Sequence, residues 1–186
     1  MAQRTLDTQT TVVPTKFAHM VINTRQYEEM KRWYGDVLGM EVVVDNGMLC
    51  FLTFDDEHHR LALVNLPDLK EQSPEYAGVN HVAYTLPDLG SLLATYLRLK
   101  ASDILPWWCI NHGPTTSMYF RDPDGNAIEL QVDNFSDERL TNWMRSEKFQ
   151  ENPLGVEFDP DLLAEKYCAG DTLETLHEQG SALKKS

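Results

Sequence analysis

Three polar residues stand inside short apolar runs and could together bind a metal ion. His19 lies in KFAHMVIN, His81 in GVNHVAYT and Glu129 in NAIELQVD. Each histidine shares one face of a predicted strand with apolar residues, because strand side chains alternate between faces, and Glu129 is flanked by Ile128 and Leu130. Burial of such polar groups without a partner is costly. Two imidazoles and one carboxylate form the facial triad that holds a non-haem Fe(II) ion and leaves positions open for substrate and O₂. Zinc on the same ligands would favour hydrolysis.

A sequence repeat relates the two histidines. Residues 17–21 align with residues 79–83 at an offset of 62, which places His19 on His81. Each copy reads as a strand, a helix and three further strands. We therefore predict an α+β fold of two paired βαβββ modules, residues 14–75 and 76–135, whose sheets curve around a shared cleft.

The order of elements within each module explains how the three residues could meet. Both histidines are predicted in the middle of the first strand of their module, and both should face the cleft. Glu129 is on the last strand of the second module, after the turn Asp122-Pro123-Asp124-Gly125. Proline and glycine favour a tight turn there, and a slip of one residue would move Glu129 to the other face of the sheet.

Local signals in the first module support the assignment of its elements. The run TRQYEEMKRWYGDVLGM has apolar residues at helical spacing. Thr24 is placed to be its N-cap, and Gly39 is placed to end it in a left-handed conformation. Asn46-Gly47 separates two apolar runs, a pattern typical of a β-hairpin.

The two ends of the chain differ from the modules. Residues 1–13 are polar and without periodicity, and we interpret them as a loose N-terminal leader. Residues 136–186 are predicted to form a helical C-terminal tail that wraps the core. Within it, DERLTNWMRSEKF and DLLAEKYCAGD read as helices, and the polar stretch from residue 172 onward is expected to fray.

Composition excludes several classes of protein. The chain has 16 Lys and Arg against 29 Asp and Glu, a net charge of −13, which argues against nucleic acid and anionic membranes as partners. No stretch approaches the roughly 20 apolar residues of a membrane span. Three distant cysteines without a CxxC pair predict neither a zinc knuckle nor a disulfide framework, so we expect a reducing, cytoplasmic location.

The paired modules and the motifs FAHMVINT, NHVAYTLPD and RDPDGNAIELQVD resemble the vicinal oxygen chelate superfamily. Within it, HHRLALV and NHGPTTSMYF are similar to the type I extradiol catechol dioxygenases. The likeness covers roughly residues 14–135 and implies the glyoxalase/bleomycin resistance/extradiol dioxygenase fold. It also implies an Fe(II)-dependent enzyme, with Mn(II) as an alternative, that cleaves an aromatic diol with O₂.

The resemblance also implies roles for individual residues. His19, His81 and Glu129 match the iron ligands of the family. His59 matches an acid–base histidine near the O₂ site. His112 and Tyr119 match the residues that hydrogen-bond substrate and intermediates.

Other functions remain open at this point. The scaffold could act without oxygen as an isomerase or lyase on Mn, Ni or Zn, or bind an aromatic ligand without catalysis. The strand LALVNLPD lacks the fourth carboxylate ligand of the glyoxalase I branch, which favours an open three-ligand site. Trp107 and Trp108 could stack on an aromatic substrate. A homodimer or higher homo-oligomer is expected, because members of the superfamily often dimerise.

Overall fold

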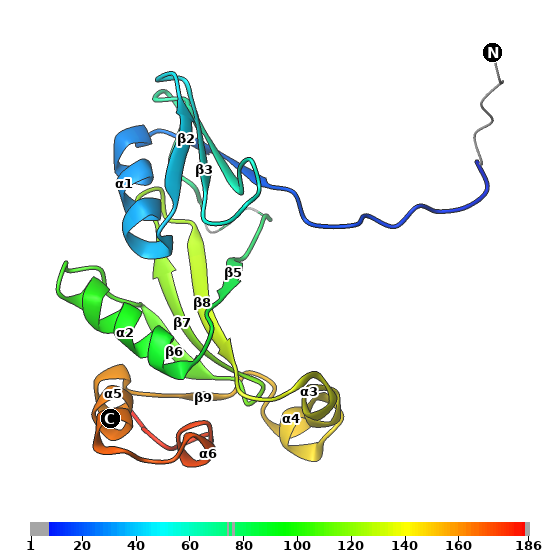
Figure 1. Cartoon of the computed structure of the whole chain (residues 1–186), viewed down its shortest axis with the longest axis vertical. Coiled ribbons are helices and arrows are strands. Elements are labelled where there is room, and N and C mark those ends of the chain that lie inside the picture. Colours follow the sequence, from blue (N-terminus) through cyan, green and yellow to red (C-terminus); the bar gives the residue numbers. More distant parts are fainter. Residues whose placement is uncertain (1–7, 74, 76, 185–186) are drawn as a thin grey trace.

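The computed structural model describes residues 8–73, 75 and 77–184, and residues 1–7 of the expected leader lie outside the described part. Two sheets with helices against them build the molecule (Figure 1). The first module contains β1 (Met20–Thr24), α1 (Tyr27–Leu38), β2 (Glu41–Asp45), β3 (Leu49–Thr53) and β4 (Leu61–Asn65). The second contains β5 (Val82–Thr85), α2 (Leu89–Lys100), β6 (Trp108–Asn111), β7 (Thr115–Arg121) and β8 (Ala127–Asp133). The tail contains α3 (Asp137–Met144), α4 (Glu147–Glu151), β9 (Val156–Glu157), α5 (Pro160–Ala169) and α6 (Leu173–Leu176).

Both sheets have the same strand order, as the repeat predicts. The first sheet runs β1-β4-β3-β2, and the second runs β5-β8-β7-β6-β9. In each module the first strand lies at a sheet edge and pairs in parallel with the last strand, while the other pairs within the module are antiparallel. The predicted α+β fold of two βαβββ modules with a helical tail is confirmed.

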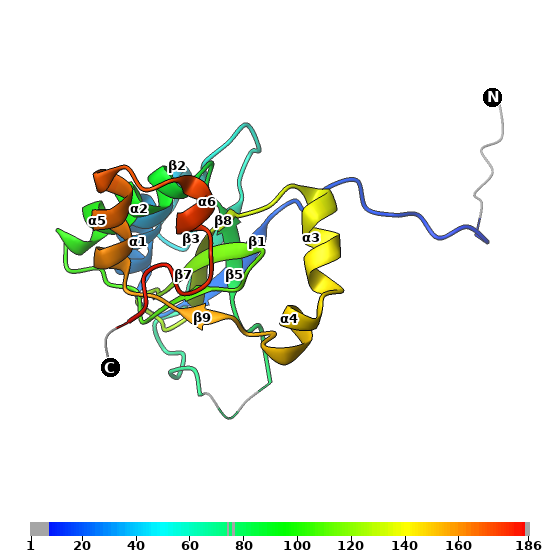
Figure 2. The ribbon, with the colours of Figure 1, turned by 90° about the horizontal axis from the view of Figure 1, so that it is seen from below.

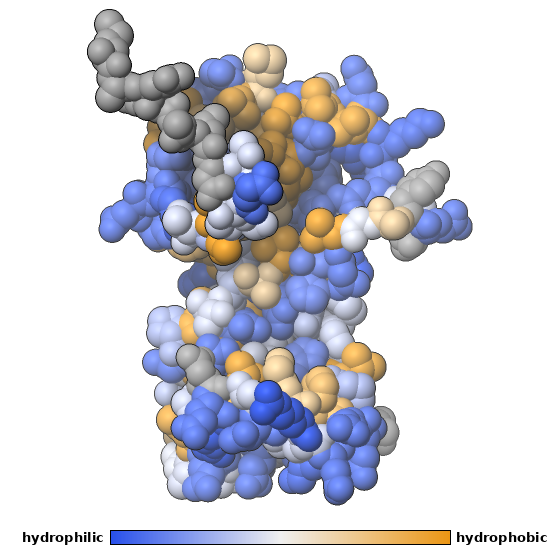
Figure 3. Space-filling model, turned by 90° about the vertical axis from the view of Figure 1, so that its right-hand side faces the viewer, coloured by the Kyte–Doolittle hydropathy of each residue, from blue (hydrophilic) through white to orange (hydrophobic). Residues whose placement is uncertain are grey.

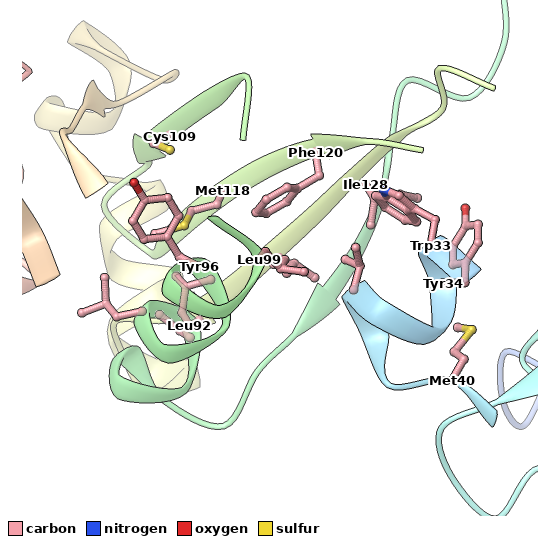
Figure 4. Packing of buried hydrophobic residues seen from close by; sticks show 14 of the residues in the cluster. Trp33, Tyr34, Met40, Leu92, Tyr96, Leu99, Cys109, Met118, Phe120 and Ile128 are labelled. Carbon is pink, nitrogen blue, oxygen red and sulfur yellow. The ribbon is translucent and has the colours of Figure 1, made fainter. Parts of the chain in front are cut away.

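One hydrophobic core joins the modules and the tail. Trp33 and Tyr34 of α1 belong to the same buried cluster as Phe120 and Ile128 of the second sheet, and Figure 4 shows Trp33 close to Ile128. Side chains of α5 and α6 complete this cluster from the tail. Neither module therefore buries its apolar face alone. No described helix has both the length and the apolar character needed to cross a bilayer.

The structure tests the predicted start and end of helix α1, and the predicted start is wrong. Helix α1 begins at Tyr27 after Gln26, not after Thr24. The Thr24 hydroxyl still accepts the Gln26 amide proton, but it is buried at the end of β1, one turn before the helix. The C-terminal prediction is confirmed, because Gly39 follows α1 with φ of 63°.

Both histidines lie just before their strands, whereas we expected them in the middle of these strands. β1 begins at Met20 and β5 at Val82, one residue after His19 and His81 respectively. The ladder of β5 with β8 begins at Val82, whose partner is Ile128. The two imidazoles thus lie where each edge strand enters its sheet.

The end of the tail is packed, contrary to the expected fraying. Thr172 caps α6 by accepting from the Thr175 amide, and Leu176 is buried. A bridge between Phe158 and Leu183 and the burial of Ala182 hold the following residues on the second module. Sparse apolar residues are sufficient here, because Leu176 and Ala182 enter the shared core.

Asp122 connects the turn before β8 to the first module. Its Oδ1 accepts from the amides of Asp124 (3.0 Å) and Asn126 (2.8 Å), and its Oδ2 accepts from the Asn126 side chain (2.7 Å) and the Tyr34 hydroxyl (3.1 Å). Burial raises the pKa of Asp122 above its usual value. This carboxylate therefore fixes both the turn and the position of α1 relative to β8.

Replacing Asp122 with Ala should lower the free energy of unfolding by about 2–4 kcal/mol, because several buried donors lose their acceptor. Urea denaturation measures this change. Asp133→Ala, at the exposed end of β8, is the matched control and should change little. An Asp122→Ala protein as stable as the wild type would show that the Asp122 hydrogen bonds do not hold β8 in place.

Stability should fall in alkaline solution. Burial raises the pKa of Cys50 to about 11, and of Cys109, Tyr84 and Tyr96 to about 12. The unfolded chain releases these protons at lower pH than the folded chain, so their contribution is complete below about pH 9 and is lost as pH rises toward 12. Melting temperatures measured across this range should decrease steadily. A constant melting temperature would contradict the burial of these groups.

Candidate active site

The register of β5 and β8 brings His81 next to Glu129. Ala83 of β5 is the direct partner of Glu129, so His81, two residues earlier, has its side chain on the same face. The Nε2 atom of His81 lies 3.0 Å from Oε2 of Glu129. Only 4% of Glu129 is exposed, so this carboxylate is buried beside a partly exposed imidazole.

Asn80 orients the His81 ring. Its side-chain oxygen lies 2.7 Å from Nδ1 of His81 and can accept the proton of that nitrogen. A neutral imidazole with its proton on Nδ1 presents the lone pair of Nε2 to Glu129. An imidazole nitrogen and a carboxylate oxygen are both donor atoms that a cation can bind, so the chemistry of this pair fits a metal ion.

Tyr119 and His112 lie on the other side of the acid. Tyr119, on β7, is the cross-strand partner of Glu129, and its ring is perpendicular to that of His81 at 5.3 Å between centroids. The Tyr119 hydroxyl lies 3.1 Å from Nε2 of His112. Trp108 of β6 packs on Tyr119 at 4.9 Å and forms an aromatic wall. The second module thus brings an acid, two imidazoles and a phenol to one face.

His19 belongs to a second group of rings on the first module. Its ring centroid lies 4.2 Å from that of His59, which stacks on Phe51 with an interplanar angle of 8°. The Nδ1 atoms of His58 and His59 are 2.6 Å apart, so one donates to the other. His59 is buried, whereas the side chain of His58 is 68% exposed.

The two groups lie on opposite sides of a seam between the modules. One cavity is lined by residues 20–23 and 79–82, and a second by Phe17 and Met20 on one side and residues 82–87 on the other. Residues of β1 and β5 line both cavities, so these two strands lie near each other at the seam (Figure 2). Figure 3 shows an apolar surface on the upper part of the molecule, where the first module lies, and Phe17 and Val21 of this module are exposed.

The structure brings together some of the predicted ligands but not all of them. His81 and Glu129 are in contact on the second module, while His19 contacts His59 within the first module. Within the described ranges, no three His, Cys, Asp or Glu side chains form a group that could hold a metal ion. The donor types fit a metal, and His19 is the ligand that would have to join the other two.

The surroundings of His59 and Tyr119 shift their proton affinities in opposite directions. Burial, and then the positive charges that His19 and His58 can carry, lower the pKa of His59, so the neutral imidazole is favoured. Burial, and then the charge of Glu129, raise the pKa of Tyr119, so its hydroxyl keeps its proton. The site therefore contains a neutral imidazole on one module and a hydrogen-bond donor on the other.

The sequence profile of the Glyoxalase/Bleomycin resistance protein/Dioxygenase superfamily matches residues 16–130, more than half of the chain. The chain belongs to this superfamily. Two relatives from Rhodococcus globerulus cover nearly the whole chain. Biphenyl-2,3-diol 1,2-dioxygenase 2 is 45% identical over 171 residues (91% of this chain, 90% of the relative), and biphenyl-2,3-diol 1,2-dioxygenase 3 is 46% identical over 177 residues (94% and 93%).

More distant superfamily members agree with the fold. Catechol-2,3-dioxygenase of Bacillus subtilis is 28% identical over 87% of this chain and 54% of its own length. The crystal structure of lactoylglutathione lyase from Agrobacterium tumefaciens superposes with a TM-score of 0.52 at 20% identity, over 64% of this chain and 94% of that protein. A glyoxalase/dioxygenase from Nostoc punctiforme gives 0.54 at 22% identity, over 68% and 99%. These two structures support the fold alone.

Sequence reasoning missed two groups beside the site. Asn80 could have been found, because a polar residue next to His81 is a typical orienting partner of a metal-binding histidine. The backbone carbonyl of Leu154 could not, because it carries no side-chain signal. It lies 2.5 Å from Nδ1 of His112 and comes from the tail, 42 positions along the chain.

Proposed function

We propose that this superfamily member is an extradiol dioxygenase. It would cleave the ring of a catechol-type diol next to its two hydroxyl groups, with O₂ and one Fe(II) ion per site, and both oxygen atoms would enter the product. The reaction then needs no external reductant. Mn(II) is the alternative metal.

One observation carries the proposal. The pair of His81 and the buried Glu129 lies directly beside the Tyr119–His112 hydrogen bond. A cation-binding pair next to two groups that can bind a diol hydroxyl suits a reaction in which substrate and metal meet. The Rhodococcus relatives, whose names state ring cleavage of biphenyl-2,3-diol, share nearly half of the sequence and support the same reaction.

We assign the metal to His81 and Glu129, with His19 as the third ligand from the facing module. When bound, Fe(II) would supply the electron transfer between diol and O₂ that organic side chains cannot. The Tyr119 hydroxyl would donate a hydrogen bond to a substrate oxygen, because its raised pKa keeps the proton in place. His112 would orient the substrate from the same wall, and Trp108 would pack against its ring.

His59 would act as the acid–base residue. It lies beside His19, and its lowered pKa favours the neutral imidazole, which can receive a proton from the substrate hydroxyl at Nε2. The same proton could return to an oxygen of the opened product. Phe51 holds the ring in place by stacking on it.

The direct test loads the purified protein with Fe(II) without oxygen and then measures O₂ consumption on addition of 2,3-dihydroxybiphenyl, catechol and other aromatic diols. Consumption of one O₂ per diol with a yellow ring-opened product is expected. Diol binding without O₂ consumption by iron-loaded protein would contradict the proposal and would favour an isomerase or lyase.

Replacing His81 or Glu129 with Ala should weaken Fe(II) binding by at least about 100-fold, because each substitution removes a direct donor. His19→Ala should have the same direction of effect. Anaerobic equilibrium dialysis measures the affinity. Gln131→Ala, one pleat further along the same face of β8, serves as the matched control. Iron binding that survives the loss of Glu129 would exclude this ligand set.

Replacing His59 with Phe should slow turnover by about 10²-fold or more, the usual scale for a lost acid–base group, while Fe(II) affinity stays unchanged. Phe keeps the stacking on Phe51. Asp56→Ala, an exposed position on the same loop, is the neighbouring control and should keep most of the activity. Wild-type turnover of His59→Phe would remove His59 from the reaction.

A further inference from the structure

The tail encloses the short segment that carries His112. Strand β9 pairs with β6 through Asn111 and Val156. The Asn111 side chain donates to the His177 carbonyl (2.9 Å), and the Gln179 side chain donates to the Asn111 carbonyl (3.0 Å). Two separate parts of the tail, at residue 156 and at residues 177–179, thus converge on the residue before His112.

Two close approaches complete this enclosure. Gly155 has φ of +106°, and a Cβ atom added there would lie 2.7 Å from Cα of His112. On the other flank Gly113 has φ of +96°, and a Cβ atom there would overlap the indole of Trp143. Only glycine allows both contacts. The His112 segment is therefore fixed between two parts of the tail.

The Leu154 carbonyl determines where His112 carries its proton. A carbonyl oxygen only accepts hydrogen bonds, so Nδ1 of His112, at 2.5 Å, must be the donor. In a neutral imidazole the other nitrogen then has no proton. Nε2 of His112 consequently accepts from the Tyr119 hydroxyl, and the direction of that hydrogen bond is fixed.

Asn152 holds the Leu154–Gly155 peptide in position. Its side-chain oxygen accepts from the Gly155 amide at 3.1 Å, and its side-chain nitrogen donates to the Gly155 carbonyl at 2.6 Å. Asn152 itself is exposed, so its side chain contributes to this loop and not to the core.

We propose that the loop 152–155 is a positioning element of the active site. Asn152 and Gly155 hold the Leu154 carbonyl against His112, which keeps the proton on Nδ1 and makes Nε2 a hydrogen-bond acceptor. Nε2 accepts from the Tyr119 hydroxyl in this structure, and it would accept from a substrate hydroxyl when Tyr119 turns its own proton to the substrate. The part of this inference that concerns substrate rests on the proposed function. The part that concerns the tautomer does not, and the tests below separate the two.

The first test is nitrogen NMR of histidine-labelled, metal-free protein at a pH where imidazole is neutral, with the His112 signals assigned by their loss in His112→Phe. Wild-type protein should show the proton on Nδ1 of His112. Asn152→Ala should shift His112 toward a mixture of the two tautomers, and Gly155→Ala should do so more strongly. Thr172→Ala, which removes a cap elsewhere in the tail, should leave the signals unchanged. A proton on Nε2 in the wild type, or an unchanged tautomer in both loop variants, would overturn the inference.

The second test is a double-mutant cycle on ring cleavage. Asn152→Ala should lower kcat about tenfold by misplacing His112, with KM changed less than about twofold. In a His112→Phe background the same substitution should have no further effect, because it acts through His112. An equal loss in both backgrounds would mean that Asn152 acts elsewhere and would overturn the positioning role. If wild-type protein shows no ring cleavage at all, the proposed function fails, and the NMR result alone decides the tautomer.

Discussion

The parallel pairing of β5 with β8 is the constraint on which the candidate site depends. It sets Ala83 opposite Glu129 and so places His81 on the same face as the acid. Because side chains alternate along a strand, a slip of one residue would turn Glu129 into the core and separate the pair. The pairing is protected by the Asp122 turn, which precedes β8 and is tied to α1 by the Tyr34 hydroxyl. The pairing of β5 with β8 therefore supports both the stability of the second sheet and the position of the candidate site.

The division of the site between two modules gives each a different task. The second module provides a carboxylate and a phenol that are almost fully buried, together with a wall of aromatic rings. The first provides His19 and His59 on the opposite side of the seam. A shared hydrophobic core sets the distance between the modules, so packing around Trp33 and Ile128 influences how closely the two groups of donors approach each other.

Much of this arrangement could be predicted from the sequence. The features that could not be predicted depend on contacts between distant segments or on backbone groups. The offset that pairs His19 with His81 and the odd position of Glu129 in an apolar strand are side-chain patterns, and these patterns indicated the modules and their order. The start of each edge strand depends on a partner strand far along the chain, which explains why both histidines lie outside the ladders. The packing of the tail depends on a few apolar residues such as Leu176 that enter a core built by other segments. The Leu154 carbonyl is a backbone group and has no counterpart in the sequence pattern.

The central claim is that the two modules of one chain form a single metal centre, and anomalous diffraction at the iron edge from anaerobically grown, Fe(II)-loaded crystals tests it most directly. We expect one iron peak per chain, within bonding distance of His19, His81 and Glu129 of the same chain. A peak bound to His81 and Glu129 with His19 still packed on His59, or a peak at other residues, would contradict it.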